Sequence, residues 1–272
     1  KEAETAENVL VIGSGLVGLD AAYGLIEKGK NITVVEMADR ILPVQLDAHA
    51  AMAYQERFEK AGVRFVLERK ASQAVCEPDG RIRKVILDNG EAIPCDLIIV
   101  AAGVRSSLAC LEGSGIACER GVTVDSSMRT SQKDIYAAGD ITALSGIWPN
   151  AADQGRVAGK NMCGHPAEYS DTYAAKNTIN FFGLVTLCVG RIREEEGDQV
   201  CIREDQRQYK RIILKDGKVE GILFQGNIAH AGIWQYLIKN KIDVSKIGKD
   251  AFDITYADFY HVGDRGQYEW VQ

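Results

Sequence analysis

The 272-residue sequence predicts an α/β fold, with a doubly wound parallel sheet in its first part and a small α+β unit in its last part. Two observations predict the sheet. Apolar runs of strand length alternate with segments of helical periodicity, and a glycine-rich turn follows the first run. A third observation predicts the α+β unit, because strand-like runs beyond about residue 165 follow one another and two of them are joined by a hairpin turn.

The elements of the first part alternate between strand and helix. The apolar run 8–12 predicts a strand that ends at Gly13, and the helical periodicity after it stops at Gly29. A hairpin around residues 88–90 leads into a buried strand. The predicted elements, in chain order, are at 8–12, 16–28, 31–36, 47–61, 63–67 and 96–101. This βαβ alternation is typical of a doubly wound sheet.

Residues 103–164 contain short segments and many small residues, and we expect one strand at 135–138 and one helix from about 149 to 162. The last part is richer in strands. They are predicted at 178–191, 209–214 and 219–225, with a hairpin turn at 215–218 and a helix from about 233 to 239. These changes of pattern divide the chain into three domains, residues 1–103, 104–165 and 166–272.

Composition and charge narrow the classes of partner. Hydrophobic residues make up 46% of the chain, as in ordinary globular proteins, and the net charge is −6 with scattered lysines and arginines. Such a distribution has no basic face for a phosphate backbone, so we expect no nucleic acid partner. The apolar stretch 178–190 is too short to cross a bilayer, and no signal peptide is visible. We therefore expect no membrane contact and a cytoplasmic location.

The seven cysteines, at positions 76, 95, 110, 118, 163, 188 and 201, have no C-x-x-C spacing. This pattern disfavours a disulfide framework, a zinc site and an iron–sulfur cluster. We expect reduced thiols that pack as small apolar groups, and no metal site.

A glycine-rich motif follows the first predicted strand and has the sequence Gly13-Ser14-Gly15-Leu16-Val17-Gly18. Glycines suit such a turn because the turn is tight, the backbone must approach a pyrophosphate closely, and the helix must pack on the strand. The helix amides then face the phosphates. Glu36 lies 21 residues after Gly15, at the end of the second strand, where a carboxylate can accept hydrogen bonds from both ribose hydroxyls. Together these features predict a Rossmann-like NAD(H)-binding domain.

Three charged residues near this motif bear on the choice of nucleotide. Glu36 would repel a 2′-phosphate, so NAD(H) is favoured over NADP(H). Arg40 favours NADP(H) instead, because a guanidinium can reach such a phosphate, although a solvated loop residue is the more common role of an arginine at such a position. Asp20 either projects toward the nicotinamide end of the cleft or is an acid that the helix dipole favours near the helix N-terminus. Both interpretations of Asp20 stay open.

A second motif, Ile135-Tyr136-Ala137-Ala138-Gly139-Asp140, predicts contact with a second nucleotide. Small residues let the main chain lie against a ligand at Gly139, and Asp140 offers a carboxylate to a ribityl hydroxyl. The helix that follows supports this interpretation, because each helix-interior glycine costs about 1 kcal/mol relative to alanine and so implies close packing. One face of it comprises Ala151, Gly155, Ala158, Gly159 and Met162. If Asn150 or a neighbour begins this helix, its amides would face the pyrimidine edge of a flavin.

These motifs resemble the pyridine nucleotide-disulfide oxidoreductase superfamily, especially its NADH oxidases, its rubredoxin reductases and the flavoprotein part of nitrite reductase large subunits. The matching blocks are 9–18, 34–43, 96–103, 130–140 and 151–162, and the strands beyond residue 178 resemble the third, interface domain. The resemblance implies that Gly103 lines the nicotinamide side and that Asp140 and Ala151 contact FAD. It also implies a set of NAD-binding residues, namely Gly13, Gly15, Gly18 and Glu36. The chain departs from the family at Ser106-Ser107, where Pro-Asn is frequent, and at Asp20, where glutamate is frequent.

The resulting hypothesis is a flavin-dependent oxidoreductase that transfers hydride from NAD(P)H to FAD and passes electrons to an external acceptor, either a small molecule or a redox protein. No side chain need act as a catalytic group. The chain begins only a few residues before its first motif. We therefore expect the back portion of such an enzyme, with a partial FAD domain, weak or no FAD retention and no activity of its own.

Two alternatives stay open. The first is a non-catalytic NAD-binding or redox-sensing module, which would have no use for the second motif. The second is an NADH-dependent disulfide or persulfide reductase, which requires a cysteine upstream of this chain. For the quaternary structure, apolar Phe181-Phe182 and the additional domain favour a homodimer.

Overall fold

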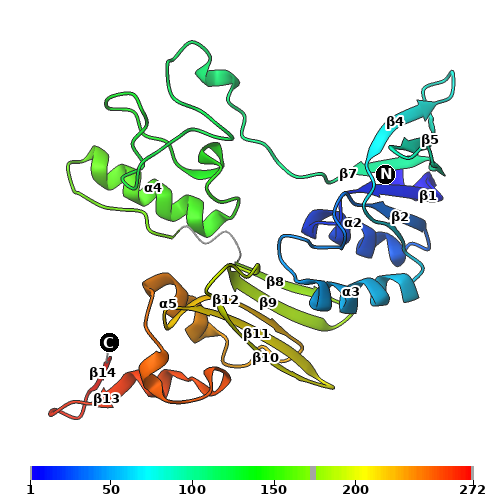
Figure 1. The fold of residues 1–272 in the computed structure, drawn as a ribbon. Helices are drawn as coiled ribbons and strands as arrows, with labels where there is room; N and C mark the ends of the chain where they lie inside the picture. Colours follow the sequence, from blue (N-terminus) through cyan, green and yellow to red (C-terminus); the bar gives the residue numbers. More distant parts are fainter. Residues whose placement is uncertain (1, 172–175, 271–272) are drawn as a thin grey trace.

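The first part of the fold is a parallel four-stranded sheet. The computed structural model describes residues 2–171 and 176–270, and Figure 1 shows this sheet beside the N-terminus. Its order is β3-β2-β1-β7, and its strands are β1 (Asn8–Ile12), β2 (Asn31–Val35), β3 (Arg64–Val66) and β7 (Leu97–Val100). The short α1 (Glu2–Thr5) precedes β1, while α2 (Leu16–Ile26) and α3 (Ala48–Lys60) connect successive strands. All paired strands run parallel, so the predicted βαβ alternation is confirmed.

A smaller antiparallel sheet covers one face of β1. It consists of β4 (Ala71–Cys76), β5 (Ile82–Leu87) and β6 (Ala92–Pro94). Leu10 of β1 packs with Val85 and Leu87 of β5 in one buried cluster, which explains why β1 is apolar on both faces. The predicted hairpin around residues 88–90 is confirmed as the β5–β6 connection. β4 escapes sequence-based prediction, because most of its side chains are exposed and its burial does not alternate.

Residues 104–165 contain two 3₁₀ turns, η1 (Ala109–Leu111) and η2 (Gly139–Thr142), and the predicted helix, confirmed as α4 (Trp148–Met162). The predicted strand at 135–138 is wrong. Tyr136 forms only a bridge to Arg129, and the Ala137 amide donates to the Met128 carbonyl 3.1 Å away, so this segment folds back on the residues before it. A strand needs a neighbour for its main-chain groups, and none of the strands in the described residues lies beside this segment.

The last part is a five-stranded antiparallel sheet in the order β10-β11-β12-β9-β8, with α5 (Gly232–Asn240) packed against it (Figure 1). Its strands are β8 (Lys176–Phe181), β9 (Leu184–Gly190), β10 (Gln199–Asp205), β11 (Gln208–Lys215) and β12 (Lys218–Gln225). The predicted 215–218 hairpin is confirmed, with positive φ at Asp216 and Gly217. The single strand predicted at 178–191 is wrong, because the chain reverses at Phe182 and Gly183, both with positive φ.

Short elements complete the described chain after α5. They are the 3₁₀ turns η3 (Ser245–Ile247), η4 (Ala251–Asp253) and η5 (Tyr256–Phe259) and the hairpin of β13 (Tyr260–Val262) and β14 (Tyr268–Trp270). A capping box between Thr255 and Asp258 begins η5. Ile254 and Phe259 then pack into the buried cluster between α5 and the sheet, so this tail covers the sheet rather than the nucleotide motifs.

One hydrophobic core extends across the first and last parts of the chain. Phe181 and Phe182 pack against Tyr23 of α2 and Phe58 of α3, with ring centroids 4.9 to 5.5 Å apart. These two residues therefore give weaker support to a homodimer, because Phe181 is buried and Phe182 is partly buried within the chain itself. The homodimer itself stays a prediction. The last sheet thus packs against α2, which begins in the first motif, and against α3.

Candidate functional site

The glycine-rich turn lies between β1 and α2, and its three glycines have three different environments. Gly13 has φ +101°, and a Cβ there would lie 2.5 Å from the Ala101 carbonyl oxygen. A Cβ on Gly18 would lie 2.0 Å from the Gly13 carbonyl oxygen. Around Gly15, no atom lies within 4 Å of the Cβ position. The turn and the helix packing therefore require Gly13 and Gly18, whereas Gly15 faces open space that a ligand can enter.

The N-terminus of α2 lies directly above this turn. Gly15 is its N-cap and supplies no side-chain cap. Leu16 packs against the core, whereas Val17 is 71% exposed on the first helical turn. Asp20 is also exposed, just beyond that turn. The first-turn amides are thus placed to receive an anion, with the helix dipole favouring negative charge there.

Glu36 directly follows β2, and its carboxylate is bound to the glycine-rich turn. Oε2 accepts hydrogen bonds from the Ser14 amide and the Ser14 hydroxyl, both at 2.8 Å. Oε1 accepts from the Ala38 amide at 2.9 Å. Because Ser14 is fully buried, these contacts fix the carboxylate beside the turn. The structure thus brings Glu36 and the first motif together, while the contact with a ribose stays a prediction.

Arg40 is engaged within its own loop. Its Nε donates to the Leu46 carbonyl at 3.2 Å, its Nη2 donates to the Pro43 carbonyl at 3.4 Å, and its Nη1 pairs with Asp39 at 2.7 Å. The side chain is only 21% exposed. A guanidinium with these three partners braces the loop after β2, which agrees with a structural role and not with a free anchor for a 2′-phosphate.

The second motif ends in a tight turn held by a residue that sequence reasoning missed. The Gly139 amide, at φ +82°, donates to Gln154 Oε1 at 2.7 Å, and the Thr142 hydroxyl lies 3.3 Å from the same oxygen. Gln154 is fully buried on α4. The Asp140 side chain is exposed, and its carbonyl accepts from the Ser106 hydroxyl at 2.6 Å. The sequence contains no signal for this role, because a lone glutamine does not reveal which group it will bind.

The first turn of α4 contains the other predicted flavin residues. The helix begins at Trp148, two residues before Asn150, and its N-cap is Ile147. The Asn150 side chain is buried and faces away from the motif, since it donates to the Asp171 carbonyl at 3.4 Å and accepts from Lys176 at 3.2 Å. Ala151 lies under the motif, 3.6 Å from the Cβ position of Gly139. Only the main chain of Asn150 is thus available for the predicted flavin contact.

A cleft joins the segment after β7 to the second motif. Gly103, with φ +94°, Asp140 and Ser145 lie along it, so the structure brings two of the predicted site residues together. The Ser145 hydroxyl is buried without a hydrogen-bond partner among the described residues, as expected for a group that faces a ligand. The first motif and Glu36 do not line this cleft. The two motifs therefore belong to separate surfaces in this arrangement.

The donor groups at the two surfaces fit the groups that the family resemblance implies. Open space at Gly15, free helix amides and an anchored acid suit the pyrophosphate and ribose of a dinucleotide. The exposed Asp140 and the partnerless Ser145 hydroxyl suit the polar side of a flavin. Within residues 2–171 and 176–270, no group of three His, Cys, Asp or Glu side chains is arranged to bind a metal.

The thiols and the helices give two further results. Cys95 and Cys188 are buried, and burial raises the pKa of Cys188 to about 11, so this thiol is held in its neutral form. In the part of the chain that the structure describes, no helix has the length and apolarity required to traverse a bilayer.

The parallel sheet, the open helix N-terminus and the anchored acid define an α/β protein of the dinucleotide-binding class. Comparison of the sequence with models of known protein families identifies the family within this class. A model described as pyridine nucleotide-disulphide oxidoreductase matches residues 1–155, and one described as rubredoxin NAD⁺ reductase C-terminal domain matches residues 176–242. The chain belongs to the pyridine nucleotide-disulphide oxidoreductase family.

Individual relatives agree with this assignment. The epsilon subunit of the NADH-dependent phenylglyoxylate dehydrogenase of Aromatoleum evansii is 31% identical over 89% of this chain and 60% of its own length. A nitrite reductase [NAD(P)H] of Bacillus subtilis is 29% identical over 88% of this chain and 30% of its own length. The crystal structure of the ferredoxin reductase for the CYP199A2 system from Rhodopseudomonas palustris superposes with a TM-score of 0.77 at 26% identity, over 93% of this chain and 65% of that one. The chain thus spans less than two thirds of each of these proteins.

Proposed function

We propose that this chain is the NADH-binding and acceptor-side portion of a flavin-dependent oxidoreductase that passes electrons from NADH, through FAD, to an external acceptor. The observation that carries the proposal is the Glu36 carboxylate, which two hydrogen bonds of 2.8 Å from Ser14 hold beside an open glycine turn. A flavin, when bound, supplies the ring that accepts a hydride from the nicotinamide. The protein's contribution is to bind and orient the two partners.

The first motif and Glu36 bind the dinucleotide in this proposal. The first-turn amides of α2 bind the pyrophosphate, and Gly15 leaves room for its approach. Glu36 accepts a hydrogen bond from the adenosine ribose. Three donors already bind its two oxygens, so the carboxylate needs little reorganisation when the ribose arrives. Val17, exposed at the helix start, gives an apolar edge along which the dinucleotide lies.

The second motif has a corresponding part on the flavin side. Asp140 accepts a hydrogen bond from a ribityl hydroxyl, and Ser145 supplies a hydroxyl that lacks a partner among the described residues. Pro149 has no amide and the Ala151 amide donates to the Ile147 carbonyl at 3.1 Å, so we assign to the Asn150 amide the stabilisation of negative charge at the pyrimidine edge of a reduced flavin. Ala151 would contact the flavin only by packing. We assign Gly103 to the nicotinamide side, and it lies along the same cleft as Asp140. The division into residues 1–103, 104–165 and 166–272 follows these roles.

NADH is the proposed donor in preference to NADPH. Glu36 would repel a 2′-phosphate. Arg40, the candidate for binding such a phosphate, has three partners in its own loop. For the acceptor we propose a small redox protein, because the C-terminal match is to a rubredoxin reductase domain and one structural relative is a ferredoxin reductase. A cytoplasmic location and a homodimer stay predictions.

Calorimetric titration of NADH and NADPH into the native full-length protein tests the proposal. Glu36→Gln keeps the size of the side chain and removes its charge, so NADH affinity should fall about 10- to 100-fold, as for a lost charge-assisted hydrogen bond. Glu56→Gln, which changes an acid on the far part of α3, is the matched control and should leave NADH affinity unchanged. An unmodified protein that binds neither nucleotide would refute the proposal.

A further inference from the structure

The loop from Glu36 to α3 is fastened to the glycine-rich turn. The Leu42 amide donates to the Ser14 carbonyl at 3.0 Å, and the Ser14 amide and hydroxyl in turn bind Glu36. Ile41, Leu42 and Leu46 are fully buried, so the loop cannot shift without moving the turn. Leu42 also has φ +48°, a left-handed conformation that only surrounding contacts can maintain in a leucine. The far end of this loop is therefore important for the geometry of the site.

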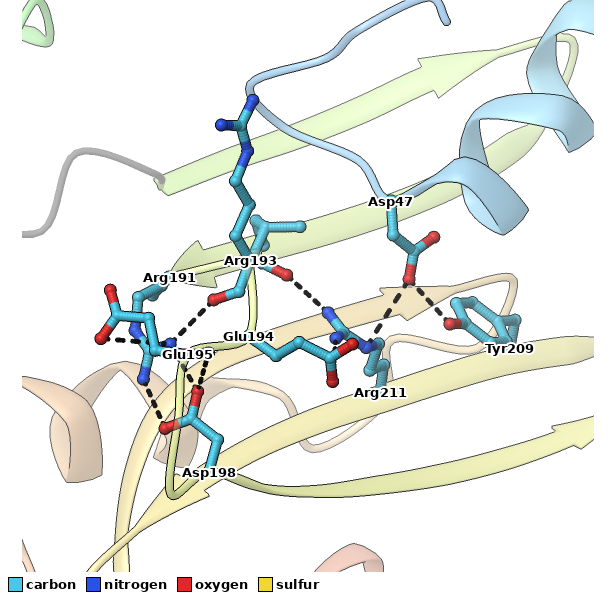
Figure 2. Close-up of polar contacts among 9 residues, drawn as sticks. Asp47, Arg191, Arg193, Glu194, Glu195, Asp198, Tyr209 and Arg211 are labelled. Carbon is cyan, nitrogen blue, oxygen red and sulfur yellow. Dashed lines mark hydrogen bonds and ion pairs between the residues drawn. The ribbon is translucent and has the colours of Figure 1, made fainter. Parts of the chain in front are cut away.

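Asp47 fastens that far end to the last sheet, as Figure 2 shows. Its Oδ1 accepts from the Ala50 amide at 2.9 Å and so caps α3. Its Oδ2 is not needed for the cap. That oxygen accepts from the Tyr209 hydroxyl at 2.7 Å and lies 3.9 Å from Arg211 Nε, and both partners come from β11. One carboxylate thus joins the nucleotide loop to a strand more than 160 residues away in sequence.

The two β11 residues are themselves held in place. Burial, followed by the hydrogen bond to Asp47, raises the pKa of Tyr209 well above its usual range, so its hydroxyl keeps its proton and donates at all ordinary pH. Arg211 donates to the Ile192 carbonyl and pairs with Glu194 at 3.5 Å, and its side chain is only 9% exposed (Figure 2). Asp47 therefore meets a rigid support and not a mobile surface group.

We propose that Tyr209 and Arg211 are positioning residues for the adenosine half of the dinucleotide: by holding Asp47 they fix the loop that sets the place of Ser14 and Glu36. This inference rests on the proposed NADH binding. Strand β11 of the last sheet would then contribute indirectly to the affinity for the dinucleotide.

A second buried contact separates this role from simple support of α3. Tyr54 lies about two helical turns beyond Asp47. Its hydroxyl donates to the Leu184 carbonyl at 2.7 Å and lies 2.9 Å from the Thr186 hydroxyl. Gln225 donates to the Ala50 carbonyl at 3.1 Å. These contacts tie α3 to the same sheet but touch no residue of the loop. Removing the Tyr54 hydroxyl therefore weakens the same packing without releasing the loop end.

The test compares Tyr209→Phe with Tyr54→Phe in the native full-length protein, with ADP-ribose as the probe of the adenosine half. Tyr209→Phe should weaken ADP-ribose binding about 5- to 20-fold, as expected for one lost hydrogen bond to a charged group. It should raise KM for NADH by a similar factor and leave kcat unchanged, because only the adenosine end is displaced. Tyr54→Phe should lower the thermal midpoint while ADP-ribose affinity stays within about twofold.

A third variant links the effect to Asp47. Asp47→Asn can still cap α3, since asparagine is as good an N-cap as aspartate, but it presents a weaker, uncharged acceptor to Tyr209 and Arg211. It should reproduce the loss in Tyr209→Phe, and the two changes together should weaken binding little more than either alone.

The outcomes are distinguishable. If the unmodified protein does not bind ADP-ribose, the proposed function fails. If it binds, and Tyr209→Phe binds equally well, the inference is overturned. Equal weakening by Tyr209→Phe and Tyr54→Phe also overturns it, because the sheet would then act only through general stability.

Discussion

The two nucleotide motifs stand in regions that are built very differently. Around the first motif, both faces of the parallel sheet are covered, and the buried cluster includes Leu19, Tyr54 and Phe58. Around the second, the buried cluster is limited to Met128, Ala158 and Tyr169, and turn hydrogen bonds shape the motif. The first region is therefore fixed by its own apolar contacts. The second has little buried apolar surface to offset its conformational entropy, so its order depends more on polar contacts.

Truncation of a core ring tests this difference most strongly. Phe58 is fully buried among the rings of α2, β3 and the β8–β9 turn, so Phe58→Ala should lower the free energy of unfolding by about 3–5 kcal/mol. Met128→Ala, the matched change in the second region, should leave the main unfolding transition in place. Urea denaturation followed by circular dichroism measures both. Equal losses would mean that the two regions unfold as one cooperative unit.

Two glycines of α2 test how tightly the first motif is packed. Gly18→Ala forces a methyl group to within 2.0 Å of the Gly13 carbonyl, so it should cost about 3 kcal/mol and abolish NADH binding. Gly24→Ala adds the same methyl group two turns further along the helix, where nothing lies within 4 Å. It should stabilise the protein by about 1 kcal/mol, because alanine favours a helix. Thermal unfolding and calorimetry check both values, and a harmless Gly18→Ala would contradict the close contact.

The same contrast decides how much of the fold could be predicted. In the first part, the apolar runs predicted at 8–12 and 31–36 become the paired strands β1 and β2, which follow one another in the chain, and β1 pairs on its other side with the distant β7. At 135–138 a similar apolar run does not become a strand, because strand formation depends on a neighbour that periodicity does not reveal. The reversal at Phe182 and Gly183 was hidden for a related reason: two apolar strands with a tight turn between them look like one long run.

The features of the candidate site also differ in whether the sequence predicts them. The tight glycine turn and the place of Glu36 at the end of β2 depend on local geometry, and the motif predicted both. The hydrogen bonds from Ser14 to Glu36 were not predicted, because the motif named these residues only as groups that contact a dinucleotide. The supports of the site were not predictable. Gln154 reaches back 15 residues to Gly139, and Tyr209 reaches Asp47 across 162 residues. Such contacts depend on tertiary packing, and a lone glutamine or tyrosine gives no sequence signal of its partner.

A smaller effect is expected from the support of the second motif. Gln154→Leu removes the acceptor of the Gly139 amide and leaves that amide buried without a partner, which costs about 1–2 kcal/mol locally. Hydrogen exchange across residues 139–143 should therefore become about 5- to 30-fold faster. Gln55→Leu, a similar change on α3 at a side chain that pairs with Glu59, is the control and should leave this segment unchanged. Unaltered exchange in Gln154→Leu would show that the turn is stable without it.

The smallest effect concerns acid stability of the β9–β10 loop. The Arg191 guanidinium binds both oxygens of Asp198, and these hydrogen bonds lower the pKa of Asp198 to about 2 (Figure 2). An unfolded aspartate titrates near 3.9, so the folded state binds fewer protons between these values. The contribution of Asp198 to stability is therefore complete above about pH 4 and is lost as the pH falls through about 2.

Asp198→Asn should be less stable than the unmodified protein at pH 5, and the difference should shrink toward zero near pH 2 in urea titrations. Arg191→Lys retains a cation but not the paired geometry, so it should give an intermediate difference. A difference between Asp198→Asn and the unmodified protein that is the same at pH 5 and pH 2 would mean that the pair is not the source of the effect.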